Sequence, residues 1–326
     1  MKLYPIENKD KSGYISEDGE IRIPSIYDVA SSFFENLAWV RFEGKISFIN
    51  IDGDCVLTTD YLRVGEFSEG LCKFETYAYE KGYINSLGEI VINLGEIYSC
   101  ENFYKDVAVA GDSLTDEYLI DKKGNIISKH YYQISGFQYS DFGVCETLER
   151  TSCIINNHGE ELHHFPRHLK CFHYVSDDGK LFGVLDKNTD KYGIYNEKGE
   201  IVIPCRYDYP SGIFTEGLAP VSKGRKWGFI DIEENIVIPF QYDYAYSFSN
   251  GLAAVNVGGR FDGEHLRGGL WGIINKQGEM IAEPQFNGIL PFDGELAQVE
   301  WGDIEEGDSY FGYVNTKGEI VYRPEI

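Results

Sequence analysis

Residue types that bind zinc in proteins are concentrated in the middle of the sequence. Most of the seven histidines lie there with two of the cysteines: His158, His163, His164, His168 and His173, with Cys153 and Cys171. The spacing matches no zinc-ligand pattern, and adjacent histidines of one strand would point to opposite faces. We therefore predict no metal and no other cofactor, and interpret the segment as a drifted repeat with imidazoles on its polar face. If a metal does bind, the candidate ligands are His163, His168, Cys171 and His173.

Two glycine-flanked insertions, residues 258–269 and 302–308, hold other charged side chains that could act together. The first brings Arg260, Glu264 and Arg267 close in sequence, a mixture suited to acid–base chemistry or to partner binding. The second is rich in carboxylates, which bind calcium, but it lacks the twelve-residue EF-hand pattern. We favour extended, solvated hairpins for both, because function must be argued from an assembled site.

Three aromatic side chains are predicted to bind a partner. Trp39 stands at a repeat position where other copies have small or polar residues, and Trp301 shares such a mixed position with Phe42. Mixed positions indicate exposure, and exposed aromatics are typical contacts for protein or sugar partners. The predicted binding residues are Trp39, Phe42, Trp301, Arg260, Glu264 and Arg267. The alternative for the aromatics is a local packing difference near the ends of the chain.

The sequence contains no established catalytic motif. It has no serine-hydrolase elbow, no His-Glu-x-x-His, no phosphate-binding loop and no dinucleotide fingerprint. We therefore expect a protein that is not an enzyme, with no catalytic residues to name. A metal-dependent enzyme with its site in the histidine-rich middle is kept as an alternative.

The elements that must position these side chains are short strands joined by a recurring hairpin turn. The turn occurs in nine copies, which begin at Ser16, Asn50, Asn85, Asp121, Asn156, Asn196, Asp231, Asn275 and Asn315. The first side chain accepts hydrogen bonds from backbone amides two residues on, and a glycine such as Gly278 or Gly318 supplies the positive φ. The Asp231 copy is interpreted as one residue longer, with Asn235 taking the left-handed conformation.

Strands on both sides of the turn define the repeat. Before the turn, glycine separates two apolar residues, most clearly at Trp227-Gly228-Phe229, Trp271-Gly272-Ile273 and Phe311-Gly312-Tyr313. After it, a β-branched strand ends in proline, which has no amide for the ladder. A third strand opens on Gly-Leu-Ala. Consecutive apolar residues in the middle strand predict burial on both faces, and the glycine predicts close packing between repeats.

The spacing predicts one all-β array over residues 1–326. Motif glycines, or their substitutes, fall near residues 13, 47, 82, 117, 152, 193, 228, 272 and 312, roughly every 35 residues, with residues 101–191 degenerate. We predict about nine three-stranded antiparallel meanders in an open twisted superhelix. A β-propeller is the alternative, disfavoured because nine exceeds the usual blade number and no blade mixes strands from both termini.

These segments resemble the WG-repeat family. The residues that carry the resemblance are Trp227-Gly228-Phe229-Ile230-Asp231, Ile236-Val237-Ile238-Pro239, Tyr242-Asp243 and Phe248-Ser249-Asn250-Gly251-Leu252-Ala253, with Trp271-Gly272 as a second intact pair. The resemblance is strongest from about residue 192 to the C-terminus. It implies an interaction module of bacterial origin and brings no catalytic residues.

The composition of the chain bears on which classes of partner it can bind and on where it is located. The formal net charge of −24 repels phosphate backbones, which argues against nucleic acid. The start of the chain has no apolar leader, and no apolar run is long enough for a membrane helix. Seven cysteines without a Cys-x-x-Cys pair predict reduced thiols in the cytoplasm. We expect a cytoplasmic scaffold with a protein partner, and glycan or cell-wall binding is the alternative.

Overall fold

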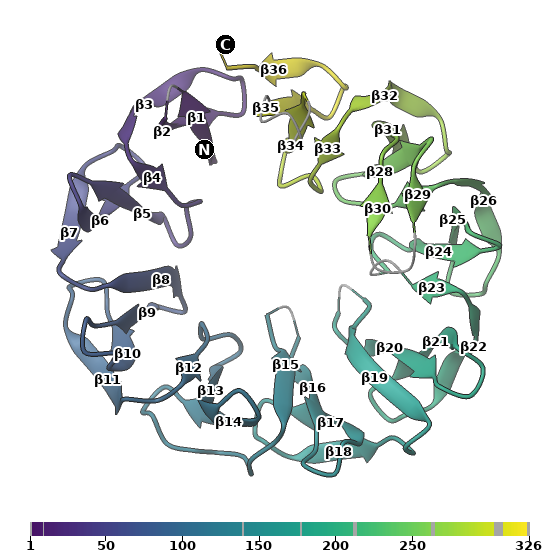
Figure 1. The fold of residues 1–326 in the computed structure, drawn as a ribbon, viewed down its shortest axis with the longest axis horizontal. Helices are drawn as coiled ribbons and strands as arrows, with labels where there is room; N and C mark the ends of the chain where they lie inside the picture. The colour runs from purple at the N-terminus through teal and green to yellow at the C-terminus, as the bar shows by residue number, and fades with distance from the viewer. Residues whose placement is uncertain are drawn as a thin grey trace. The chain divides into compact units, whose positions relative to one another are not determined.

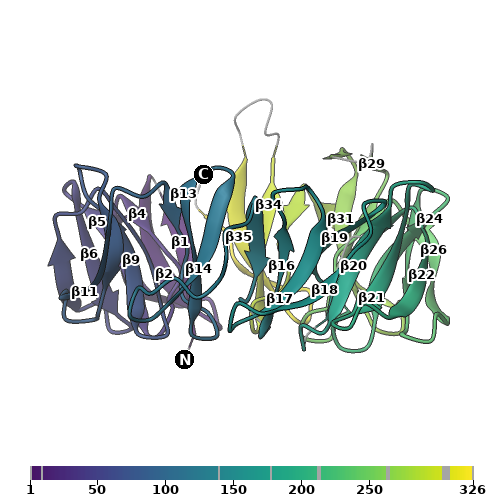
Figure 2. The same cartoon turned by 90° about the horizontal axis from the view of Figure 1, so that it is seen from below.

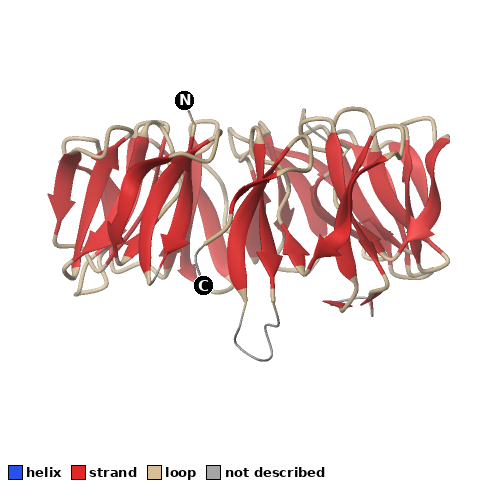
Figure 3. Ribbon diagram, turned by 90° about the horizontal axis from the view of Figure 1, so that it is seen from above, coloured by secondary structure: helices blue, strands red, loops and turns tan. Residues whose placement is uncertain are grey.

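The computed structural model describes residues 2–8, 10–138, 140–176, 178–210, 214–261, 265–302 and 309–324. Within these ranges the secondary structure is strand and loop without a helix (Figure 3). The all-β prediction is therefore confirmed for the part of the chain that is described. These ranges also include no helix that is long and apolar enough to span a lipid bilayer.

The chain folds into two compact units. The N-terminal unit comprises residues 1–16 and 20–167, and the C-terminal unit comprises residues 17–19 and 168–326. The sheets of the N-terminal unit contain β1 (Leu3–Asn8), β2 (Lys11–Ser16), β3 (Ile21–Tyr27), β4 (Val29–Ala30), β5 (Leu37–Phe42), β6 (Lys45–Asn50), β7 (Cys55–Thr59), β8 (Arg63–Ser68), β9 (Leu71–Glu75), β10 (Lys81–Ile84), β11 (Ile90–Gly95), β12 (Ser99–Cys100), β13 (Val107–Ser113), β14 (Asp116–Asp121), β15 (Gln133–Gly136), β16 (Phe142–Glu146), β17 (Ser152–Asn156) and β18 (Glu161–His164). Those of the C-terminal unit contain β19 (Leu169–Tyr174), β20 (Leu181–Asp186), β21 (Lys191–Asn196), β22 (Ile201–Tyr207), β23 (Tyr209–Pro210), β24 (Ala219–Lys223), β25 (Lys226–Ile230), β26 (Ile236–Tyr242), β27 (Tyr244–Ala245), β28 (Leu252–Val257), β29 (Arg260–Phe261), β30 (Leu266–Arg267), β31 (Leu270–Asn275), β32 (Met280–Phe286), β33 (Gly288–Ile289), β34 (Leu296–Trp301), β35 (Tyr310–Asn315) and β36 (Ile320–Tyr322).

Each sheet is an antiparallel meander, such as β4-β5-β6-β7 and β23-β24-β25-β26 (Figure 1). Its strands follow one another in the chain, except that the hairpin β29-β30 is inserted in the sheet β27-β28-β31-β32. The strands of a sheet alternate up and down in side view (Figure 2). Most sheets have four strands rather than the predicted three. The additional strand is often only two residues long, as in Tyr244–Ala245, and lies between the strand that contains the proline and the strand that opens on Gly-Leu-Ala.

The hydrophobic cores lie between successive sheets. One cluster in the N-terminal unit joins Tyr14 and Ile23 of the first sheet to Val40 and Ile49 of the second. The central strand of each sheet contributes to both faces, and β25 is buried from its second residue to its end. The predicted two-sided burial is confirmed. Its cause is that each sheet packs face to face with a neighbour within its unit.

The prediction of an open twisted superhelix is wrong. Consecutive antiparallel meanders that pack face to face are the blades of a β-propeller, and the described residues form nine of them. Among the strands that the structure describes, no blade combines strands from both termini. Instead, the turn of residues 17–19 belongs to the C-terminal unit, where a Cβ on Gly19 would lie 2.4 Å from the carbonyl oxygen of Val321 in β36. A blade built from strands of both termini is therefore not needed for a propeller, and its absence did not justify predicting an open array.

The glycine of the Trp-Gly pair packs within its own blade, not between repeats as predicted. In the register of β25 and β26, Gly228 alone stands opposite the three residues that precede Tyr242. This bulge brings the β26 backbone over the glycine, so a Cβ on Gly228 would lie 2.6 Å from the carbonyl oxygen of Ile238. Pro239 begins the bulge and does not end the strand, which continues to Tyr242.

The recurring turn forms as predicted in its main features. The side-chain oxygen of Asn275 accepts hydrogen bonds from the amides of Gln277 and Glu279 at 3.0 and 2.9 Å, and Gly278 has a φ of 79°. In addition, the side-chain amide nitrogen of Asn275 donates to the Glu279 carboxylate at 2.7 Å. This contact closes the turn on its exposed side.

One turn departs from the prediction. The Asp231 copy has the same length as the others, because the amide of residue 234 donates to the Asp231 carbonyl as Gly278 does to Asn275. Glu234, with a φ of 65°, takes the left-handed conformation assigned to Asn235. That conformation costs a non-glycine residue about 1 kcal/mol. The Glu234 carboxylate accepts hydrogen bonds from Arg206 at 2.8 Å and from Tyr207 at 3.3 Å. These contacts offset part of the cost of the left-handed conformation.

The turn uses matched pairs at its first and fifth positions, which leads to a first prediction. An asparagine pairs with a glutamate, as in Asn275 and Glu279, whereas Asp231 pairs with the amide of Asn235 at 2.9 Å. N275D should cost about 1 kcal/mol in free energy of unfolding, because two carboxylates then face each other. N275D/E279N should recover most of that loss, because it recreates the Asp231 and Asn235 pair.

Urea unfolding of both single variants, the double variant and the wild type measures this coupling as a double-mutant cycle. N235D in the preceding turn is a matched variant. It should also be destabilising, because it places a second carboxylate against that of Asp231. Additive effects of N275D and E279N would show that the pair does not act as a unit.

Candidate functional site

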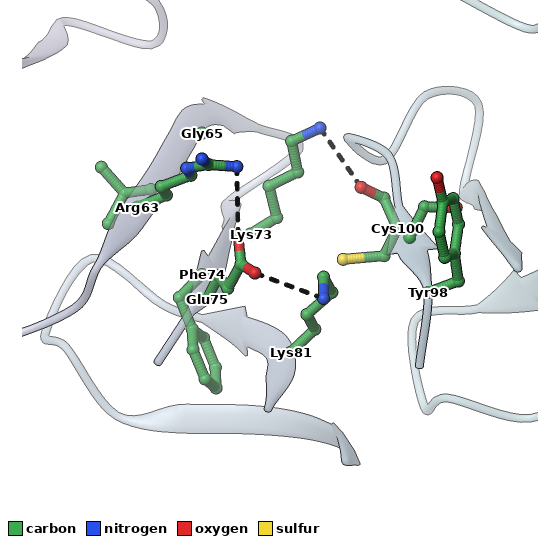
Figure 4. A pocket seen from close by; sticks show the side chains of 10 residues that line it. Arg63, Gly65, Lys73, Phe74, Glu75, Lys81, Tyr98 and Cys100 are labelled. Carbon is green, nitrogen blue, oxygen red and sulfur yellow. Dashed lines mark hydrogen bonds and ion pairs between the residues drawn. The ribbon is translucent and has the colours of Figure 1, made fainter. Parts of the chain in front are cut away.

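The N-terminal unit contains a cleft of about 420 Å³ between two successive blades (Figure 4). Residues of β8, β9 and β10 form one side, and the start of the next blade forms the other. The lining residues are Arg63, Val64, Gly65, Lys73, Phe74, Glu75, Lys81, Tyr98, Ser99 and Cys100. Three cations and one carboxylate among them make the lining basic, which is unusual in a chain with a net charge of −24.

One blade that lines the cleft departs from the intact repeat. Lys81 precedes Gly82 where Trp227 precedes Gly228, so a lysine stands at the position of the buried indole. Its ammonium donates to the carbonyl oxygens of Ile97 at 3.1 Å and Tyr79 at 3.4 Å. The side chain is only 15% exposed. The narrow lysine fills less of the space between blades than an indole would, which leaves room for a cleft.

A single carboxylate is shared by two of the cations. Glu75 lies 3.5 Å from the Lys81 ammonium and 3.7 Å from the Arg63 guanidinium. Both distances exceed the 2.7–2.9 Å that charge-assisted hydrogen bonds usually have. The Arg63 side chain is 77% exposed and so remains accessible to an anion. These three residues together carry one excess positive charge.

The third cation and an aromatic ring complete the lining. Lys73 donates to the carbonyl oxygen of Cys100 at 3.2 Å and to the Glu101 carboxylate at 2.7 Å. Tyr98 is 51% exposed beside Cys100 (Figure 4). Two more exposed tyrosines, Tyr77 and Tyr79, belong to the turn that joins β9 and β10. The surroundings of the cleft therefore combine arginine and tyrosine, the side chains enriched at binding hot spots.

The thiols near the cleft are not poised as nucleophiles. Burial raises the pKa of the Cys100 thiol, although hydrogen bonding from Tyr83 and the nearby Lys73 charge act against it. Burial likewise raises the pKa of Cys72 to about 12. Reactive cysteines need a lowered pKa and access to solvent. The lining also contains no histidine that could act as a base.

The aromatic residues predicted to bind a partner are more enclosed than expected. Trp39 is half-buried and packs at the edge of the core around Phe48. Trp301 is half-buried too, stacked on Tyr310 with ring centroids 5.6 Å apart. Phe42 is exposed and makes an edge contact with Tyr27. The structure does not bring these three residues together within one core cluster or cleft.

The first insertion forms a small hairpin of its own. Arg260 in β29 pairs with Arg267 in β30, and both side chains are exposed. Glu264 lies outside the described residues, as do residues 303–308 of the second insertion. The extended, solvated hairpin expected for the first insertion therefore agrees with its described part.

Among the described side chains, none of the candidate ligands in the histidine-rich segment belongs to a group that could hold a metal ion. His163 packs edge-on against Phe165, and partial burial, with the neighbouring His164 charge, lowers its pKa. Cys171 is buried, which raises the pKa of its thiol. His168 and Cys171 belong to the C-terminal unit and His163 to the N-terminal one. The side chain of His173 lies outside the described part of the chain.

One pair of cysteines departs from the predicted reduced state. Cys145 and Cys153 stand opposite each other on β16 and β17, with Cα atoms 5.2 Å apart, and form a disulfide. With Glu161, these two cysteines form a group of residue types that could hold a metal ion. The disulfide argues against that role, because sulfurs joined in a disulfide are not thiolate ligands. The cause is cross-strand pairing, which a search for Cys-x-x-Cys does not detect. The other five cysteines form no disulfide in the described part of the chain.

Sequence reasoning missed the cleft residues, although a signal was present. Lys81 stands in a column that holds Trp227, Trp271 and Tyr192 in the repeats with intact motifs. A cation at a position that is aromatic in the intact repeats indicates a local change of packing. Arg63 and Tyr98 carry no such signal, because neither stands at a position that the repeat motif defines.

Comparison with solved structures shows that the fold is shared over nearly the whole chain. A crystal structure of a eukaryotic initiation factor matches with a TM-score of 0.66 and 12% identity, covering 98% of this chain and 94% of that one. The computationally designed Ika8 protein matches with a TM-score of 0.51 and 11% identity, covering 96% and 99%. At such identities the likeness shows the fold alone. No curated protein matches the sequence significantly.

The family model described as "WG containing repeat" matches five segments, which together span half of the chain. They are residues 13–45, 82–110, 192–227, 227–261 and 271–302. The matched segments include the Trp227-Gly228 and Trp271-Gly272 pairs and also Gly82, beside the cleft. The motif requires glycine in the intact blades because the bulge of the next strand leaves no room for a Cβ, as at Gly228 and Gly272. The chain therefore belongs to the WG-repeat family.

Proposed function

We infer that the protein is a non-catalytic interaction module that binds a protein partner at the cleft of the N-terminal unit. The observation that carries this proposal is that the accessible Arg63 guanidinium and the exposed Tyr98 line the same cleft, where Glu75 neutralises only one of two cations. Arginine supplies directional hydrogen bonds, and tyrosine supplies rigid contact area at low cost in side-chain entropy. Membership of the WG-repeat family supports the same class of function.

The partner segment should carry a carboxylate. Arginine binds a carboxylate through two parallel hydrogen bonds, and Lys81 lies close enough to share the same Glu75 anion. The net charge of −24 does not prevent this contact. Charges separated by more than about 8 Å are largely screened at physiological ionic strength, so the local excess positive charge dominates inside the cleft.

The same cleft is poorly suited to catalysis. Its lining offers Ser99 and Cys100 as nucleophiles, but no histidine lies with them and the Cys100 thiol has a raised pKa. A hydroxyl or thiol nucleophile needs an adjacent base or a lowered pKa. A binding role therefore accounts better for the arrangement than a reaction does.

A second prediction tests this proposal by quantitative affinity purification from the source organism. We expect one or more proteins captured by the wild type to fall at least tenfold with R63Q/Y98S, which removes a bidentate cation and an aromatic contact worth about 1.4 kcal/mol or more. R22Q is the matched control, because Arg22 is also surface-exposed and paired with a glutamate, Glu20, at 2.9 Å.

The captured partner then supplies a second measurement. Synthetic peptides from its acidic segments should bind the wild type and the R22Q variant equally and the R63Q variant more weakly. Partner sets that are identical for the wild type and R63Q/Y98S would contradict the cleft as the binding surface. Turnover of a captured small molecule would contradict the non-catalytic part.

A further inference from the structure

Two carboxylates and one imidazole converge at the hairpin of β13 and β14, in the same unit as the cleft but outside its lining. One ring nitrogen of His130 and one oxygen each from Asp112 and Asp116 all lie within 4.8 Å of one another. The His130 Nδ1 and the Asp116 Oδ1 are 2.6 Å apart. The group is distinct from the histidine-rich segment and has no equivalent in the motif that defines the repeats.

The backbone aims these side chains at one another. Gly111 pairs with Glu117 and Ser113 with Asp116, so Asp112 is the extra residue of a β-bulge. A bulge redirects its side chain out of the regular alternation of the strand. His130 comes from the segment after β14, next to Tyr131, which pairs with Glu117. Three separate stretches of chain therefore deliver the three ligand atoms.

A neighbouring ring holds two of the three groups in place. The Tyr118 hydroxyl donates to Asp112 Oδ1 at 3.0 Å, and its ring packs against the His130 imidazole with centroids 4.8 Å apart. These contacts limit the rotamers of Asp112 and His130. Ligands of a metal site are commonly oriented by such outer contacts.

The electrostatics favour a cation. Asp112 and Asp116 bring two negative charges close together, and their side-chain partners are the neutral Tyr118 hydroxyl and the His130 ring rather than a lysine or arginine. A divalent ion would neutralise both carboxylates and relieve their mutual repulsion. Because Asp116 and His130 are 40% and 41% exposed, the ligand atoms can be reached from solvent.

We propose that Asp112, Asp116 and His130 form a binding site for a divalent first-row transition metal ion. Ligand oxygens and nitrogens around a tetrahedral zinc ion are about 3.4 Å apart, a spacing that small side-chain rotations from the present positions provide. An imidazole ligand disfavours magnesium and calcium, which prefer oxygen alone. Among the common divalent ions that accept this ligand set, zinc is the probe we choose because it binds nitrogen and carboxylate ligands tightly.

The test is a titration of the full-length, untagged protein with zinc, followed by isothermal calorimetry. The exposed Cys55 is first replaced in all variants as C55S, so that its thiol does not compete. We expect binding by this background protein, and at least about tenfold weaker binding by H130A and by D112N. H158A is the matched control, since His158 is an exposed histidine in a turn of the same unit, outside this group.

Imidazole nitrogen shifts in NMR spectra provide a readout that does not depend on folding differences between variants. Substoichiometric zinc should move the His130 resonances before those of any other histidine. The proposal is overturned if H130A binds zinc as tightly as the background protein. It is also overturned if another histidine responds first or if the background protein does not bind zinc.

Discussion

Replacing Gly228 by alanine should lower the free energy of unfolding of its blade by about 3 kcal/mol. A Cβ at this position would lie 2.6 Å from the Ile238 carbonyl oxygen and 2.9 Å from the Phe240 nitrogen. Both are backbone atoms, so they move only if the β26 bulge moves with them. Native-state hydrogen exchange at the amides of β25 and β26 reports this local free energy directly.

Gly183 provides a matched control within the same unit. It lies in β20 with an ordinary negative φ, and a Cβ there would meet only the Val175 side chain, at 3.3 Å. G183A should therefore change the exchange free energy of its own sheet by less than about 1 kcal/mol. Equal effects of G228A and G183A would show that the bulge does not require glycine.

Replacing Trp227 by alanine should have an effect of similar or larger size, about 3–5 kcal/mol. The indole is 1% exposed and packs on Tyr244, with ring centroids 4.8 Å apart, inside the core between two blades. Its removal would leave a cavity that the rigid strands on either side cannot close. W227F should lose roughly half as much, because a ring remains in contact with Tyr244.

The comparison with Trp39 separates structural from binding roles of tryptophan. Trp39 is half-buried at the edge of a core cluster, so W39A should cost no more than about 2 kcal/mol. Thermal unfolding followed by far-UV circular dichroism ranks the variants without relying on tryptophan fluorescence. If W227A unfolds at the same temperature as W39A, the Trp227 indole does not hold the two blades together.

The site at the cleft shows why sequence reasoning located the repeats better than the functional residues. Repetition makes structural positions visible, since the same turn and glycine recur in copy after copy. Arg63 begins β8, Lys81 begins β10 and Tyr98 precedes β12, so nothing in their spacing indicates that they meet. Only Lys81 carried a signal, as a cation at a position that is aromatic in the intact repeats.

The turns also show that a local sequence pattern fails where contacts with distant residues decide the conformation. The sequence predicted the first-position side chain and the left-handed glycine, because both follow from local backbone geometry. It misassigned the Asp231 copy, since Asn235 resembles a left-handed residue more than Glu234 does. The contacts of Glu234 with Arg206 and Tyr207, about 28 residues away in sequence, are what the local pattern lacked.

By itself the sequence determined the all-β class, the repeat, its turns and the burial of the central strands on both faces. Each of these depends on neighbours a few residues apart or on a local hydrophobic pattern. The tertiary structure alone decided that the repeats are propeller blades, that Cys145 meets Cys153, and that Asp112, Asp116 and His130 converge. Such contacts depend on the twist between stacked sheets and on the directions of bulges and connections. Those directions arise from packing summed over whole blades, which no short segment of sequence encodes.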